Sequence, residues 1–152
     1  MGAFARGNRG LCLALLLGLV ASPLLAQSPP ASSCPQPRFT GKAPDEFYNL
    51  PNPLEATEAN LAAGGALYHG DSRRVSCVTC HGATGEGDGR LAYQFDPRPR
   101  DFSCADTIRG LPDGHLFWIV RYGSPGTSMP PHKRLTDEQI WQVVHFVRRL
   151  AK

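Results

Sequence analysis

The chain of 152 residues carries 16 basic and 13 acidic side chains, which gives a formal net charge of +3. Residues 1–26 hold 2 of the basic side chains and no acidic one, so residues 27–152 carry 14 basic and 13 acidic groups and a net charge of +1. A nucleic-acid-binding domain presents a strongly basic surface, and a chain so close to neutrality excludes that class of protein. The length favours one compact domain.

The first 26 residues have the pattern of a signal peptide. Arg6 and Arg9 precede an apolar run over residues 11–26 that ends at the small residue Ala26. The run contains Pro23 and is shorter than the ~20 residues that a membrane-spanning helix needs. We therefore predict export with cleavage after residue 26 and no transmembrane anchor in the mature protein; an uncleaved anchor is the alternative. Export would place the remaining cysteines in an oxidising compartment.

Residues 27–53 contain seven of the fourteen prolines and show no apolar period. Proline removes a backbone donor and interrupts helices. We therefore predict a Pro-rich extended arm over residues 27–53 rather than a helix, followed by a folded domain over residues 54–152.

The domain is predicted to begin with a helix whose buried face contains two glycines. Leu61, Gly64, Gly65 and Tyr68 follow one another at helical spacing. Since glycine costs helix stability, the pair on one face suggests that another backbone approaches closely there.

Residues 82–101 are rich in Gly, Pro and Asp and are predicted to be a loop. A short helix is expected from Pro112 and Asp113 to Tyr122. Its inward-facing side chains are expected to be Leu116, Ile119 and Val120. The following segment, GSPGTSMPP at residues 123–131, cannot be a helix or a central strand.

The last predicted helix has the clearest signals. Thr136 and Gln139 are spaced as in a capping box, and an apolar stripe of Ile140, Val143, Val144 and Val147 follows. No alternating strand of useful length is present, so the fold class is predicted to be all-α, with three to five short helices. So little helix leaves a loop-rich domain that needs something further to complete its core.

The stretch CVTCH at residues 77–81 carries the chemistry and has three possible interpretations. A structural zinc site needs four ligands, usually from two such cysteine pairs, and the chain has one. A redox-active dithiol normally lies in a framework with strands, which are not predicted. Covalent haem fits best, because Cys77 and Cys80 can form thioethers with the two vinyl groups while His81 ligates the iron. A bulky apolar group would also complete the core.

The segment CVTCHGATGEGDG resembles the haem-attachment segment of class I c-type cytochromes, especially the bacterial periplasmic type with CxxCHGxxGxGDG. The resemblance covers about residues 54–150. It implies a cytochrome c-like fold wrapped around one covalently attached haem c, and a periplasmic location. Gly82, Gly85, Gly87 and Gly89 are expected to let the chain turn around the edge of the macrocycle.

The family's second axial ligand is a methionine in the loop before the last helix. Met129 lies in such a loop, and it is the only methionine left after removal of Met1 with the signal peptide. The resemblance therefore implies that His81 and Met129 are the axial ligands of the iron. His115 and His132 are the alternatives to Met129.

The resemblance also implies supporting roles for other residues. A proline carbonyl is expected to accept a hydrogen bond from the free N–H of His81, and the segment DPRPRDF offers Pro97 and Pro99. The first helix of the domain is expected to cross the last one near Trp141 or Phe146. Tyr93, Arg98, Arg100 and Trp118 are weaker candidates for contacts with the haem propionates.

Cys34 and Cys104 depart from the usual pattern of the family. With Cys77 and Cys80 assigned to haem, they remain as an even pair in an oxidising compartment. A disulfide between them would tie the arm to the loop after the attachment segment; a free buried thiol is the alternative.

The predicted function is that of a monohaem electron carrier in a periplasmic respiratory or oxidative chain, with no catalytic residues and no enzymatic activity. Its partners would be protein donors and acceptors that bind transiently. One alternative is a haem subunit of a specific dehydrogenase or reductase complex. The other is a ligand-binding or peroxidatic haem protein with a labile sixth ligand.

Overall fold

The computed structural model describes residues 1–2, 33–37, 40–70 and 76–152. All but the first two residues of the predicted signal peptide lie outside this part of the chain, as do residues 27–32 of the predicted arm. Within the described residues, none of the helices has the length and apolar character needed to cross a membrane.

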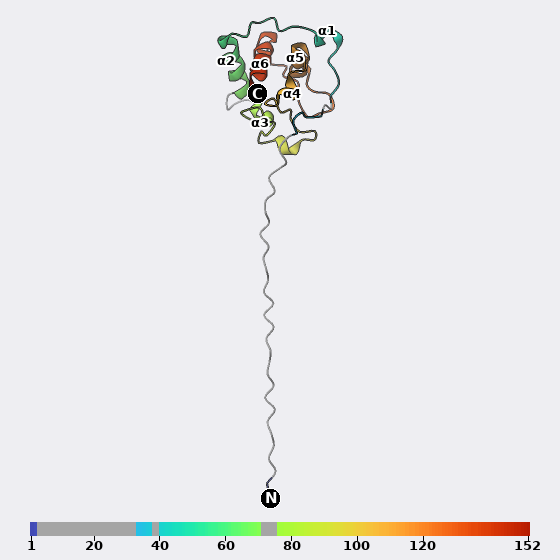
Figure 1. The fold of residues 1–152 in the computed structure, drawn as a ribbon, viewed down its shortest axis with the longest axis vertical. Helices are drawn as coiled ribbons and strands as arrows, with labels where there is room; N and C mark the ends of the chain where they lie inside the picture. Colours follow the sequence, from blue (N-terminus) through green and yellow to red (C-terminus); the bar gives the residue numbers. More distant parts are fainter. Residues whose placement is uncertain (3–32, 38–39, 71–75) are drawn as a thin grey trace.

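The described residues form helices and loops without strands, so the all-α prediction is confirmed (Figure 1). Five of the α-helices in this part of the chain lie within residues 54–152, in agreement with the predicted three to five, and a sixth lies before them. In chain order the elements are α1 (Asp45–Tyr48), α2 (Glu58–His69), α3 (Val78–His81), a 3-10 turn η1 (Ala92–Gln94), α4 (Ala105–Ile108), α5 (Asp113–Tyr122) and α6 (Asp137–Leu150).

Helices α2 and α6 pack side by side and form the main helix pair of the domain (Figure 1). A Cβ atom at Gly64 would overlap the carbonyl group of Gln142 on α6, and one at Gly65 would lie 3.0 Å from the ring of Phe146. The predicted close approach of another backbone at these glycines is therefore confirmed. Tyr68, one turn further along α2, is fully buried, and its hydroxyl donates to the carbonyl oxygen of Gly82 at 2.8 Å.

Helix α6 has the predicted capping box. The Thr136 hydroxyl accepts from the backbone N–H of Gln139, and the Gln139 side chain accepts from the N–H of Thr136. The predicted apolar stripe is buried, together with Trp141. In the last turn, Arg148 donates to Asp113 and to the Ile108 carbonyl oxygen, which ties α6 to the ends of α4 and α5.

The prediction of an extended arm is wrong over one helical turn. Helix α1 lies within residues 27–53, where Phe47 packs edge-to-face on Tyr122 of α5 at 5.5 Å between ring centroids. A Cβ atom at Gly114 would overlap the carbonyl oxygen of Phe47, so α1 lies directly against α5. The turn is stabilised by this packing rather than by a periodic sequence, which explains why no pattern in the sequence indicates it.

A disulfide joins Cys34 in the arm to Cys104 at the start of α4, across a separation of 70 residues. We expect alkylation of the unreduced protein to label neither cysteine, and alkylation after reduction to label both. A bond that closes a loop of this length should contribute about 2–4 kcal/mol to the free energy of unfolding, which the Cys34→Ser/Cys104→Ser variant would lose. Mass spectrometry of the labelled peptides and denaturant unfolding measure these effects. A label on either cysteine before reduction would rule the bond out.

Candidate functional site

The CVTCH segment forms a single helical turn. Cys77 is the N-cap of α3, and the backbone N–H of His81 donates to the Cys77 carbonyl at 2.8 Å. The helix ends at Gly82, whose φ of 80° is unfavourable for residues with a side chain. One turn therefore presents two sulfur atoms and one imidazole to the same region, with both thiols free of any disulfide.

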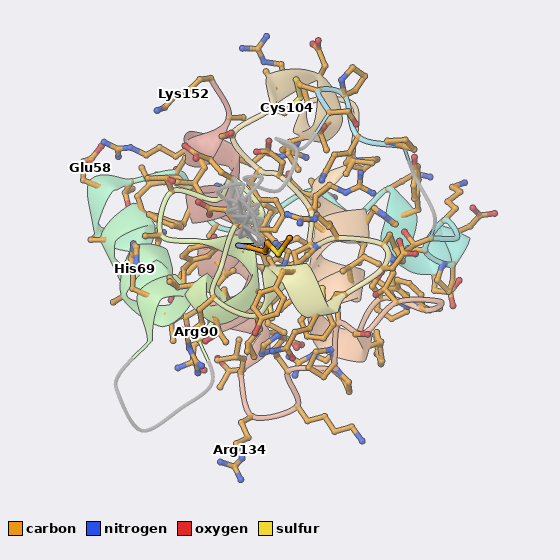
Figure 2. The ribbon with its side chains drawn as sticks, turned by 90° about the horizontal axis from the view of Figure 1, so that it is seen from below. Glu58, His69, Arg90, Cys104, Arg134 and Lys152 are labelled. Carbon is orange, nitrogen blue, oxygen red and sulfur yellow. A yellow bond between two sulfur atoms is a disulfide. The ribbon has the colours of Figure 1, made fainter. Side chains whose placement is uncertain are left out.

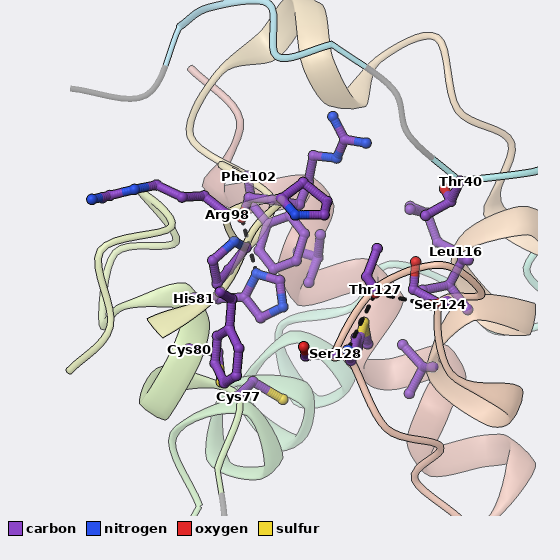
Figure 3. A pocket seen from close by; sticks show the side chains of 18 of the residues that line it. Thr40, Cys77, Cys80, His81, Arg98, Phe102, Leu116, Ser124, Thr127 and Ser128 are labelled. Atoms are coloured by element: carbon purple, nitrogen blue, oxygen red, sulfur yellow. Dashed lines mark hydrogen bonds between the residues drawn. The ribbon is translucent and has the colours of Figure 1, made fainter. Parts of the chain in front are cut away.

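These groups line an apolar cavity of about 480 Å³. Figure 3 shows Cys77, Cys80 and His81 on one side of it, and Ser124, Thr127 and Ser128 of the α5–α6 loop on the other. Aliphatic side chains from the loop before α5, from α5 and from α6 form much of its wall: Leu111, Leu116, Ile119, Val120, Val143, Val144 and Val147. Leu116, Ile119 and Val120, which were predicted to face inward from α5, thus line this cavity. The helices alone do not complete the core, because its centre is a cavity that can hold a ligand.

His81 is 7% exposed, and its orientation is fixed by the loop that follows η1. Its Nδ1 lies 2.9 Å from the carbonyl oxygen of Arg100, which accepts a hydrogen bond when Nδ1 carries the proton. The carbonyl expected from Pro97 or Pro99 is therefore that of Arg100, one residue beyond the second proline. Pro97 and Pro99 both line the cavity.

Two features make His81 suited to bind a metal ion through Nε2. Burial lowers the pKa of the imidazole to about 4, against a smaller opposing effect of the Arg100 carbonyl, so the ring is neutral at pH 7. The ring is also held in place by stacking on Phe102, since the two ring centroids lie 4.3 Å apart and the ring planes differ by 17°. Sequence reasoning missed Phe102, because nothing in its local pattern distinguishes it from other loop aromatics.

Burial disfavours the thiolate form of both cysteines. Burial raises the pKa of Cys77 to about 11 and also raises the pKa of Cys80. Dithiol redox chemistry requires a thiolate, so the raised pKa values disfavour that interpretation of CVTCH. Moreover, the described residues contain no group of three or more His, Cys, Asp or Glu side chains placed to hold a metal ion. A structural zinc site needs four ligands, so this part of the chain also disfavours the zinc interpretation.

Met129 also lines the cavity, from the loop between α5 and α6. The loop is held by hydrogen bonds from the Met129 N–H to the Thr127 hydroxyl, 3.2 Å, and from the Ser124 N–H to the Met129 carbonyl, 3.2 Å. Of the alternatives, His115 accepts a hydrogen bond at Nδ1 from the N–H of Ala43, whereas His132 is partly buried at the cavity wall. The structure thus brings Met129, His115 and His132 to the same cavity as His81.

Two of the glycines after His81 lie against the chain's own backbone. A Cβ at Gly89 would lie 2.5 Å from the carbonyl oxygens of Val78 and Thr79, and one at Gly87 would lie 2.6 Å from that of Pro99. Gly89 and Gly87 thus let the loop fold tightly on α3 and on the 99–101 segment. Among the candidates for propionate contacts, Arg98 and Arg100 line the cavity, while Tyr93 is largely exposed on the surface.

Comparison with known proteins decides the family. Residues 61–151 match the family described as Cytochrome c. The chain belongs to the cytochrome c family. A search of curated proteins gave no match. Among solved structures, a chain of the Kuenenia stuttgartiensis reducing HAO-like protein complex superposes with a TM-score of 0.56 at 31% sequence identity. The match covers 66% of this cytochrome and 47% of that chain, so the cytochrome corresponds to about half of its relative.

The cavity fits the haem c that membership of this family implies. Cys77 and Cys80 would hold the group by thioethers, His81 would bind its iron through Nε2, and the aliphatic wall would exclude water from the ring. The neutral imidazole, with Nδ1 paired to the Arg100 carbonyl, leaves Nε2 available for that role. Bound haem supplies an iron that changes between the ferrous and ferric states, and the protein holds it in an apolar setting.

Proposed function

We propose that this cytochrome carries single electrons between protein partners in the periplasm, with one haem whose iron is ligated by His81 and Met129, and that it is not an enzyme. The observation that carries the proposal is the meeting of α3 and the Met129 loop at one apolar cavity (Figure 3). An iron with two protein ligands has no open position for a substrate, which favours electron transfer over catalysis.

A redox titration followed by visible spectroscopy tests this function on the haem-loaded protein from the exported fraction. We expect one reversible one-electron transition and a low-spin spectrum in both oxidation states. The ferrous protein should resist carbon monoxide, because a firm sixth ligand occupies the iron. Rapid formation of a carbon monoxide complex would instead favour a ligand-binding or peroxidatic haem protein. Several separate transitions would contradict a single haem.

The Met129→Ala variant tests the sixth ligand. We expect the ferric wild-type protein to show the near-infrared sulfur-to-iron charge-transfer band and the variant to lack it. The reduction potential should also fall, because thioether sulfur favours ferrous iron. The matched control is Ser128→Ala, a change in the neighbouring residue of the same loop, which should keep both properties. A band that survives in Met129→Ala would exclude methionine ligation.

A second candidate function is that of a haem subunit within a larger redox complex. It is favoured by the likeness to a chain that belongs to a protein complex, of which this cytochrome spans 47%. Purification from the native source at low ionic strength distinguishes the two functions. A free carrier elutes alone, whereas a subunit co-elutes with its partner in a fixed ratio.

A further inference from the structure

The side chain of Gln36, in the arm, bridges the backbone on both sides of Arg100. Its Oε1 accepts from the Asp101 N–H at 2.7 Å, and its Nε2 donates to the Pro99 carbonyl at 3.3 Å. Arg100 lies between these two contacts, and its own carbonyl oxygen faces Nδ1 of His81. One amide group thus fixes both neighbours of the residue that orients the imidazole.

Gln36 is itself held from several directions. Its N–H donates to the hydroxyl of Thr107 on α4 at 3.1 Å, and its carbonyl accepts from the guanidinium of Arg100 at 3.3 Å. Two residues earlier, the disulfide joins Cys34 to Cys104. Within residues 33–37, Gln36 is half-buried while its four neighbours are exposed. Fixing a glutamine costs conformational entropy, and these bonds offset that cost.

We propose that Gln36 is a positioning residue for His81: it holds the 99–101 segment so that the Arg100 carbonyl stays within hydrogen-bonding distance of the imidazole. The inference rests on the proposed ligation of iron by His81. Donation from the ring N–H to a carbonyl makes the imidazole a more basic ligand. A more basic ligand stabilises ferric iron, so the loss of Gln36 weakens the hydrogen bond and raises the reduction potential.

The Gln36→Ala variant, loaded with haem, tests this role. Proton NMR of the ferrous protein detects the Nδ1–H proton of His81 directly. In the variant we expect this signal to move upfield and its exchange with solvent to accelerate at least several-fold, together with a positive shift of the reduction potential. The matched control is Gln94→Ala. Gln94 is exposed and its side chain donates to the neighbouring Tyr93 hydroxyl, so its loss should leave all three readouts unchanged.

The Cys34→Ser/Cys104→Ser variant separates the side chain of Gln36 from the covalent tether. It keeps Gln36 and its four hydrogen-bonding groups, so the ring proton should change less than in Gln36→Ala. A full change in the disulfide variant with none in Gln36→Ala would assign the role to the tether and overturn the proposal.

The proposal is also overturned if the ring proton in Gln36→Ala behaves as in Gln94→Ala, or if the potential falls, which would indicate entry of water rather than a weaker hydrogen bond. The wild-type spectrum distinguishes this failure from failure of the proposed function. A ring-current-shifted Nδ1–H signal from an iron-bound His81 confirms the ligation on which the inference rests. If wild-type protein lacks it, both proposals fall together.

Discussion

Replacing both Cys77 and Cys80 with alanine should leave the chain without any covalently bound haem. Both sulfur atoms belong to the same helical turn and face the same cavity as His81 (Figure 3). Without a thioether, the remaining hold on the group is His81 and apolar contact. We expect the mass of the denatured variant, produced where the wild type acquires haem, to equal that of the polypeptide alone. Each single variant, Cys77→Ala or Cys80→Ala, should retain one thioether.

The same double variant should lose most of its folded stability. For a cavity of 480 Å³ that stayed dry, ~24 cal/mol per Å³ gives a cost on the order of 10 kcal/mol as an upper limit. Typical domains are stable by only about 5–15 kcal/mol. We therefore expect a strongly reduced helical circular dichroism signal at 25 °C, and a lower unfolding midpoint in denaturant.

The matched control for this experiment is the Cys34→Ser/Cys104→Ser variant, which removes the same number of sulfur atoms from the disulfide instead. It should keep its haem through denaturation and lose only the contribution of the tether to Cys104, which Figure 2 labels. Covalently bound haem in Cys77→Ala/Cys80→Ala would contradict the assignment of these thiols.

The parts of the fold that were predictable are those with local causes. The capping box at Thr136 and Gln139 depends on side chains three residues apart, and the structure contains it. The glycine pair on α2 indicated a close approach because glycine in a helix needs a steric reason, and α6 supplies it. Spacing alone also placed Cys77, Cys80 and His81 on one turn.

The parts that were not predictable depend on contacts between distant segments. Helix α1 forms because Phe47 packs on α5, and four residues are too few to show a helical period. The hydrogen bond to the Arg100 carbonyl, rather than to that of Pro97 or Pro99, depends on the position of a loop that Gln36 contacts from more than sixty residues earlier. The stacking of Phe102 on His81 has the same origin.

The α2–α6 crossing leaves no room for a methyl group at Gly64. We expect Gly64→Ala to lower the free energy of unfolding of the haem-loaded protein by about 2 kcal/mol. Overpacking costs up to about 3 kcal/mol, and the better helix propensity of alanine offsets about 1 kcal/mol of it. The new Cβ would meet the carbonyl group of Gln142, which is backbone and cannot turn away. Denaturant unfolding followed by circular dichroism measures the loss.

Gly65→Ala is the matched control, since it makes the same change in the same helix one residue later. Its Cβ would lie 3.0 Å from the ring of Phe146, a side chain that can shift by a few tenths of an ångström. The gain in helix propensity should then leave the stability within about 1 kcal/mol of wild type. Equal losses in the two variants would mean that the helix backbone, rather than its contact with Gln142, determines the cost. A larger loss in Gly64→Ala alone would show that α6, which carries Val143 and Val147 at the cavity wall, is positioned by backbone contact with α2.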